Sequence, residues 1–298
     1  MTSDEAGRSL PGRLPTAVGD AYKAWSQYVE QVESVVHLTH DGFRMSQNTP
    51  ELYEVLYGDL PDPEGKHAFM IQEAKRRASY AKRESQAGFP IVHAHALLGL
   101  WGALECFIED SFLATLESET SILAEDPFRK IRLPVSMLLL GSEHERFRAI
   151  LGEVSRATDA DLALGVSRFE RLLRMVHADG PVPSRVRDSI FQTQQIRNVW
   201  AHRGGYADAR FVERCPHLGF SPGQRIDLDP RRFLHYMHGF HMYGLVIMNR
   251  YLARYGRDRV ESECVGYEGV WRELEGGDAA PIAQAPCGTP LRAAPSTS

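Results

Sequence analysis

The chain has 298 residues, of which 43% are hydrophobic and 24% are charged, a composition typical of a soluble globular protein. This length can build one large domain or two smaller ones. The formal net charge is -5 at pH 7, which excludes a molecule that is basic over its whole surface. Any contact with nucleic acid must therefore rest on a local basic patch.

The N-terminal composition and the cysteines favour a cytoplasmic protein. Residues 1–19 are polar, with glycine and proline, and carry no apolar signal-peptide core. No uninterrupted apolar run in the sequence approaches the roughly 20 residues needed to span a bilayer, so no membrane contact is predicted. Cys106, Cys215, Cys264 and Cys287 form no CxxC pair, which predicts independent, reduced thiols and neither a disulfide framework nor a structural zinc site.

Composition divides the chain into parts. Residues 1–20 are expected to be disordered, and residues 21–62 are expected to form an N-terminal helical segment. The run 61–65, with two prolines and a glycine, predicts a soft boundary. Residues 63–258 are expected to form a helical bundle, and the tail 274–298, rich in Ala, Pro, Gly and Ser, is expected to be disordered.

Helical periodicity predicts the individual elements. In the N-terminal segment, helices are expected over 21–36 and over 50–57, the second with Thr49 as N-cap and Pro50 in its first turn. In the bundle, the predicted helices cover 66–84, 91–117, 142–154, 159–177, 184–202 (capped by Ser184) and 229–255. The pattern is lost over 204–228, which predicts a long loop or a small hairpin before the last helix. The predicted fold class is therefore all-α.

The most informative stretch closes the helix over 184–202, where a glycine pair follows. Asn198 and His202 are four residues apart and share a helical face, which Gln194 extends by one turn. Arg197 lies one position round the helix, close enough to reach the same ligand. A cation, an amide and a titratable imidazole in one place suit the binding or cleavage of a phosphodiester.

Residues 197–202 (RNVWAH), with the glycines after them, resemble the Arg-x4-His signature of the HEPN superfamily. The loop that follows, the extended segment 226–228 and the long last helix are similar to the C-terminal half of that family. The helix around residues 100–110 is similar to an earlier helix of the family's bundle. The resemblance covers the chain from Lys66 to Tyr255.

This resemblance implies an antiparallel helical bundle, here with inserted helices between Ser118 and Gly180. It also implies a homodimer in which the two motif helices face each other. Active members of the family are metal-independent endoribonucleases, often toxins or antiviral effectors. Other members have lost catalysis and serve as binding or scaffolding modules.

Metal-independent cleavage of RNA needs a base for the 2′-hydroxyl proton, a cation for the phosphorane charge and an acid for the leaving oxygen. An imidazole has an unperturbed pKa of about 6.5, so His202 fits the role of base or acid. Arg197 can clamp two phosphate oxygens, and Asn198 can orient the imidazole or the phosphate. We expect these three residues to be catalytic, with a second histidine supplied by the partner chain and no cofactor.

Three further residues are expected to support the site. Gln194 and Arg203 flank the motif on the same helix. Glu105 lies in the middle of a strongly apolar helix, on the border of its apolar stripe. We expect this carboxylate to approach Arg197 and hold its guanidinium in place. The alternative for Glu105 is an ordinary position on the helix surface.

Two basic clusters, Lys75-Arg76-Arg77 and Arg231-Arg232, are candidates for RNA binding, with a solvated helix face as the alternative. His235, His238 and His241 recur at a spacing of three, and imidazoles are common zinc ligands. No carboxylate or cysteine lies at the usual flanking spacing, so no metal site is predicted.

The favoured interpretation is a cytoplasmic endoribonuclease of HEPN type that acts as a toxin or phage-defence effector, with an antitoxin or defence protein as candidate partner. The alternative is a non-catalytic HEPN-like module that binds RNA, a nucleotide or a protein. In a third interpretation the chain is an all-helical interaction protein whose motif is only a helix cap: Arg197 pairs with an acid, Asn198 bonds the backbone and His202 interacts with the helix dipole. This last interpretation predicts no pocket around Arg197.

Overall fold

The computed structural model describes residues 14–157, 163–262 and 264–274. Within these ranges the protein is all-α, as predicted, and its one β-type pairing is an isolated antiparallel bridge between Tyr206 and Arg225. The longer helices are α1 (Thr16–Tyr57), α2 (Lys66–Gln86), α3 (Pro90–Ser118), α6 (Glu143–Ala157), α7 (Val166–Met175), α8 (Ser184–Arg203) and α10 (Pro230–Arg254). The shorter elements are η1 (Thr120–Ala124), α4 (Asp126–Arg129), α5 (Val135–Leu140), α9 (Ala209–Arg214), η3 (Pro216–Leu218) and α11 (Val270–Leu274).

The helix α1 is continuous, so the prediction of two separate N-terminal helices is wrong. Pro50 lies inside α1, and the Thr49 hydroxyl donates to Met45 O at 3.4 Å instead of capping a new helix. Proline removes one N–H donor, but packing against α2 along this stretch supports the helix across the missing bond. The predicted disorder of residues 1–20 is wrong from Thr16 onward, while residues 1–13 and the predicted tail from 275 onward lie outside the described residues.

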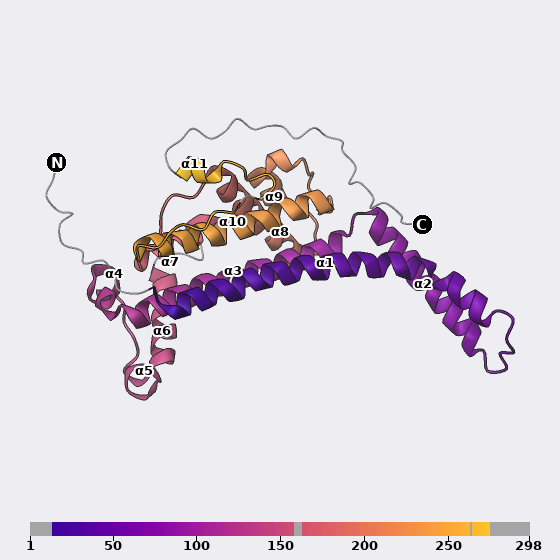
Figure 1. Cartoon of the computed structure of the whole chain (residues 1–298), viewed down its shortest axis with the longest axis horizontal. Coiled ribbons are helices and arrows are strands. Elements are labelled where there is room, and N and C mark those ends of the chain that lie inside the picture. Colours follow the sequence, from indigo (N-terminus) through magenta and orange to yellow (C-terminus); the bar gives the residue numbers. More distant parts are fainter. Residues whose placement is uncertain (1–13, 158–162, 263, 275–298) are drawn as a thin grey trace.

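The helices α1 and α2 form a hairpin whose far end projects beyond the rest of the molecule (Figure 1). The predicted boundary at 61–65 is the turn between them. The other half of α1 packs on the bundle, where Trp25 stacks on Phe107 of α3 and contacts Phe240 of α10, with ring centroids 6.3 and 6.2 Å apart. The N-terminal segment is therefore part of the same hydrophobic core as the bundle.

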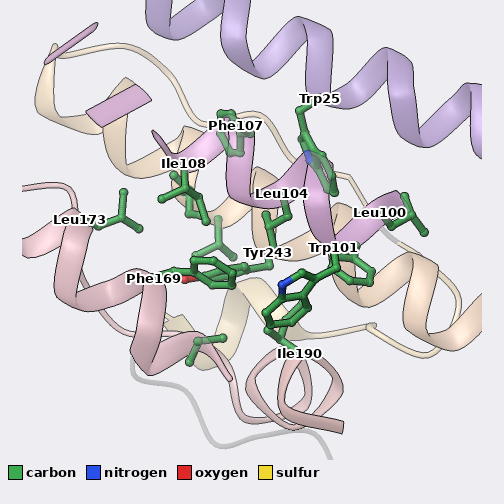
Figure 2. Close-up of a cluster of buried hydrophobic side chains, with 14 of the residues drawn as sticks. Trp25, Leu100, Trp101, Leu104, Phe107, Ile108, Phe169, Leu173, Ile190 and Tyr243 are labelled. Carbon is green, nitrogen blue, oxygen red and sulfur yellow. The ribbon is translucent and has the colours of Figure 1, made fainter. Parts of the chain in front are cut away.

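The central helix of that core is α3. Its Leu100, Trp101 and Leu104 are at most 1% exposed, and Figure 2 shows them among core residues that include Phe169 of α7 and Tyr243 of α10. By length and composition α3 could also span a membrane, contrary to the expectation from the sequence. In this structure its apolar surface packs against α1, α8 and α10. Burying such a surface supplies most of the free energy that holds a bundle together.

The helices α8 and α10 begin with different caps. Asp229 caps α10, because its Oδ1 accepts hydrogen bonds from Arg231 N and Arg232 N at 2.9 and 3.0 Å. Ser184 does not cap α8, contrary to the prediction, since it is the first helical residue. Instead Glu273 of α11 accepts a hydrogen bond from Ser184 N at 2.7 Å, so the C-terminal helix closes the start of α8.

The segments between the long helices differ most from the prediction. Of the helix predicted over 159–177, residues 159–162 lie outside the described residues, and the described part contains the shorter α7, preceded by Gly165 at a φ of 56°. The stretch 119–141, without a predicted helix, contains η1, α4 and α5. The loop or hairpin predicted over 204–228 contains the helix α9 and a single bridge. The other bundle helices agree with the prediction to within one turn at each end.

Candidate functional site

A cleft with a volume of about 410 Å³ lies along one face of α8, toward its C-terminal end. From α8 it is lined by Gln194, Gln195, Asn198, Val199, His202 and Arg203. Asp208 and the α9 residues Arg210, Phe211 and Arg214 line it from the other side, and Ala163 and Leu164 complete the lining. Helices α8 and α9 are in contact, and they lie in the same part of the molecule in Figure 1.

The predicted stripe on α8 is confirmed, because Gln194, Asn198 and His202 all line this cleft. Gln194 is buried, Asn198 is half-buried and His202 is exposed, so the stripe runs from the core to the surface. No residue in the described part of the chain hydrogen-bonds the His202 ring, which leaves both ring nitrogens available to a ligand.

A series of hydrogen bonds fixes one guanidinium group in the cleft. Arg214 Nη1 of α9 donates to Gln195 Oε1 at 3.0 Å. Gln195 Nε2 donates to Gln194 Oε1 at 3.4 Å, and the same Gln194 oxygen accepts the backbone N–H of Gly165 at 2.7 Å. Gln194 is therefore a positioning residue that joins α8 to the start of α7. Gln195, held by Gln194, in turn fixes the Arg214 guanidinium.

The helix α9, which periodicity did not predict, contributes the remaining wall. Asp208 caps it, with Oδ1 accepting Phe211 N at 2.8 Å, while Oδ2 lies 3.7 Å from Arg203 Nε. Arg210 and Arg214 then face the cleft, so the described lining residues supply three guanidinium groups and one carboxylate. Two sequence features could have revealed this wall: Asp208 is a typical N-cap residue, and Arg210 and Arg214 after it are four residues apart, so they share a helical face.

Arg197 does not line the cleft, contrary to the expectation that it reaches the same ligand. It is half-buried on the adjoining side of α8, and its Nη1 donates to Asn198 Oδ1 at 3.2 Å. The motif arginine is therefore connected to the cleft through the Asn198 amide. It forms no ion pair within the residues that the structure describes, so the acid partner expected from a purely structural role is not observed there. Its absence from the cleft lining, by contrast, agrees with that interpretation.

The glycine pair ends α8 as predicted, with φ values of 61° at Gly204 and 88° at Gly205. Gly205 N donates to Val199 O at 3.3 Å. A Cβ on Gly205 would lie 2.9 Å from the Trp200 ring, and the Arg225 guanidinium lies 5.4 Å from the centroid of that ring. These contacts fix the path of the chain from His202 to α9.

Glu105 is engaged elsewhere, so the prediction that it holds Arg197 is wrong. Its Oε1 accepts Trp101 Nε1 at 2.9 Å and lies 3.0 Å from Arg168 Nη2. Glu105 thus joins α3 to α7, because the packing of these helices places Arg168 beside it.

The basic cluster at the start of α10 lies next to the cleft. The Arg232 guanidinium lies 5.0 Å from the centroid of the Phe220 ring. Phe220 in turn packs against Phe211 of the cleft wall, with 6.1 Å between ring centroids. The cluster on α2 lies on the projecting hairpin, where Lys75 and Arg76 are paired with glutamates.

The three histidines of α10 have separate surroundings. His235 stacks on Tyr267 at 5.3 Å between ring centroids, and His238 Nδ1 hydrogen-bonds Val265 O at 3.1 Å. Burial lowers the pKa of His241. Within the described ranges no group of three or more His, Cys, Asp or Glu side chains is placed to hold a metal ion.

No protein-family model, characterised protein or solved structure that was compared matches this chain. The fold and the site define an all-α protein with a cationic cleft at the end of one helix. Its function is inferred from the residues of that cleft.

Proposed function

We propose that the protein is a metal-independent endoribonuclease of HEPN type, with His202 as its acid–base residue. The observation that carries the proposal is that one cleft gathers an exposed imidazole, an amide and three guanidinium groups. Guanidinium forks bind phosphate oxygens bidentately, so the cleft suits a phosphodiester. Among the described residues that line the cleft, one carboxylate is present, Asp208, and it caps α9, whereas a two-metal nuclease requires several carboxylates around its ions.

In the proposed reaction the His202 imidazole removes the proton from a ribose 2′-hydroxyl, and the 2′-oxygen attacks the adjacent phosphorus. The bond from phosphorus to the 5′-oxygen breaks, which leaves a 2′,3′-cyclic phosphate, and the departing 5′-oxygen takes up a proton. Arg203, Arg210 and Arg214 stabilise the charge that develops on the phosphorane oxygens. The Asn198 amide, held by Arg197, orients the imidazole or the phosphate.

A homodimer through α8 would complete the catalytic pair. Each cleft contains one imidazole, whereas the reaction uses both a base and an acid. If two copies of α8 face each other, their His202 and Arg197 side chains converge, and Arg197 meets substrate bound at the partner's cleft. The proposed biological setting is a cytoplasmic toxin or phage-defence effector that acts without membrane contact and is controlled by an antitoxin or a defence partner.

The test is incubation of the purified protein with mixed-sequence RNA in EDTA. We expect His202→Ala to lower the cleavage rate at least about 100-fold, the usual contribution of a general acid or base. His217→Ala removes an exposed imidazole of η3 that does not line the cleft and should cleave at the wild-type rate. The wild-type products should carry 2′,3′-cyclic phosphate ends. Equal rates for wild type and His202→Ala would contradict the proposal.

A second candidate function is a non-catalytic module that binds RNA, a nucleotide or a protein in the same cleft. One observation favours it: no described residue hydrogen-bonds the His202 ring, whereas catalytic bases are generally held by a third group. This function predicts that the wild type binds RNA without cutting it. The second function is supported over the first if Arg214→Ser weakens RNA binding and neither the wild type nor any variant forms a cyclic-phosphate product.

A further inference from the structure

A second hollow lies on the projecting hairpin. It is a groove of about 610 Å³ between α1 and α2, lined by residues from both helices. Its charged and aromatic members are Phe43, Arg76, Arg77, Tyr80 and Arg83. We call this feature the arm groove.

The arm groove is basic although the protein as a whole is acidic. Helix α2 carries six lysines and arginines against two glutamates, whereas the whole chain has a formal net charge of -5. The two glutamates neutralise only part of this charge: Glu73 pairs with Arg76 at 2.5 Å, while Glu84 is buried and accepts Ile91 N at 3.1 Å. Arg77 and Arg83 form no ion pair within the described part of the chain. Two exposed guanidinium groups therefore remain available to an anion.

Aromatic rings lie between these cations. Tyr80 is 44% exposed, its ring centroid is 6.0 Å from that of Phe43, and the Arg83 guanidinium lies 6.0 Å from the Tyr80 ring. Bases of single-stranded nucleic acid stack on such rings while arginines follow the phosphates. Arg77 and Arg83 are six residues, or about 9 Å, apart along the helix, so they can contact different phosphates.

Packing contacts connect the arm groove with the α8–α9 cleft. Phe43 packs on Phe89 of the α2–α3 turn, with 5.7 Å between ring centroids. The neighbouring Gly88 lies against Pro230 at the start of α10. From there Arg232 reaches Phe220, which packs on the cleft wall. The N-terminal end of α10, with its two arginines, thus lies between the two sites.

We propose that the arm groove binds single-stranded RNA, so that a long RNA contacts the hairpin while another part of it occupies the cleft. The proposal rests on the proposed function for its choice of RNA as ligand. The groove holds the strand through Arg77 and Arg83 on phosphates and Tyr80 on a base.

The test is fluorescence anisotropy with a labelled, unstructured 20-nucleotide RNA, in the His202→Ala background so that no RNA is cut. Arg77→Ser/Arg83→Ser should weaken binding at least tenfold and reduce the slope of log K against log salt by about 1.4, the value for two lost phosphate contacts. The matched control is Lys66→Ser/Lys82→Ser, which removes the same charge from the same helix outside the groove. The control should bind within twofold of the background protein. Equal weakening by both pairs, or an unchanged affinity in the groove pair, would overturn the proposal.

The tyrosine supplies an independent arm of the test. Tyr80→Phe keeps the ring and should bind like the background protein, whereas Tyr80→Ser should weaken binding about tenfold through lost stacking. Equal affinities for the two variants would refute stacking in the groove. Binding requires no turnover, so a wild type that cleaves no RNA would remove the proposed function without deciding the groove. Conversely, Arg77→Ser/Arg83→Ser can be introduced into the wild-type protein. If that variant binds and cleaves long RNA like wild type, the groove proposal is refuted and the ribonuclease proposal stands.

Discussion

The Trp200 indole covers Gly205 so closely that only a hydrogen fits on its α-carbon. A Cβ there would lie 2.9 Å from the ring, and the φ of 88° already disfavours an L side chain. We expect Gly205→Ala to lower the free energy of unfolding by about 3 kcal/mol, because the clash adds to the backbone strain. Gly204→Ala is the control: its Cβ would meet nothing within 4 Å, and only the cost of the left-handed backbone, about 1 kcal/mol, is expected. Urea denaturation measures both, and equal losses would contradict the contact with Trp200.

Residue spacing predicted part of the candidate site. Asn198 and His202 share a face because residues four apart always do so on a helix, and both line the cleft. Spacing also placed Arg197 near that face, but side chains at adjacent positions point about 100° apart, and Arg197 reaches the cleft only through Asn198. The partner of Glu105 could not be predicted, since Arg168 becomes its neighbour only when α7 packs on α3.

At the scale of elements, a shielded ion pair joins α7 to α10. Glu170 and Arg250 are 13% and 14% exposed and lie 3.0 Å apart, and Tyr243 also donates to Glu170, at 2.8 Å. We expect Glu170→Ala to lower the free energy of unfolding by about 3 kcal/mol, because it leaves the Arg250 charge without its partner away from water. Asp179→Ala removes the partner of the exposed Arg174 and should change stability by less than about 1 kcal/mol. Thermal and urea unfolding compare the two, and a loss below 1 kcal/mol for Glu170→Ala would refute this role.

Elements were predictable in proportion to their length. Helices such as α3 and α10 repeat their apolar stripe over several turns, so their boundaries follow from periodicity. The six residues of α9 complete fewer than two turns, which is too short for a repeat to be recognised. At Pro50 the sequence predicted a helix start that does not exist, because packing between α1 and α2 keeps α1 continuous through the proline.

At the scale of the whole molecule, histidines in three helices make the fold sensitive to acid. Burial is the main cause that lowers the pKa of His40 to about 4 and also lowers the pKa values of His93 and His241. The folded protein therefore binds fewer protons than the unfolded chain between pH 4 and the ordinary histidine pKa of about 6.5. The contribution of these neutral histidines to stability is fully present above a pH of about 6.5, and it is lost as the pH falls toward 4.

We accordingly expect the midpoint of thermal unfolding to fall between pH 7.5 and pH 5, by about 2–4 °C for each kcal/mol lost. His40→Phe removes one titrating ring while keeping an aromatic side chain on Phe89, where the present rings stack at 3.9 Å. This variant should show a shallower dependence on pH. Differential scanning calorimetry across this range is the measurement, and a midpoint that does not change with pH would contradict the explanation.

The sequence by itself determined the all-α class, most of the long helices and the shared face of Asn198 and His202, because these depend on the periodicity of nearby residues. Only the tertiary structure decided which residues oppose that face: Arg210 and Arg214 from α9, with Arg214 held through Gln195. It likewise decided that α1 and α2 form a projecting hairpin with an aromatic and basic groove. Contacts between residues far apart in the chain depend on how helices pack, and spacing along one helix carries no information about its neighbour.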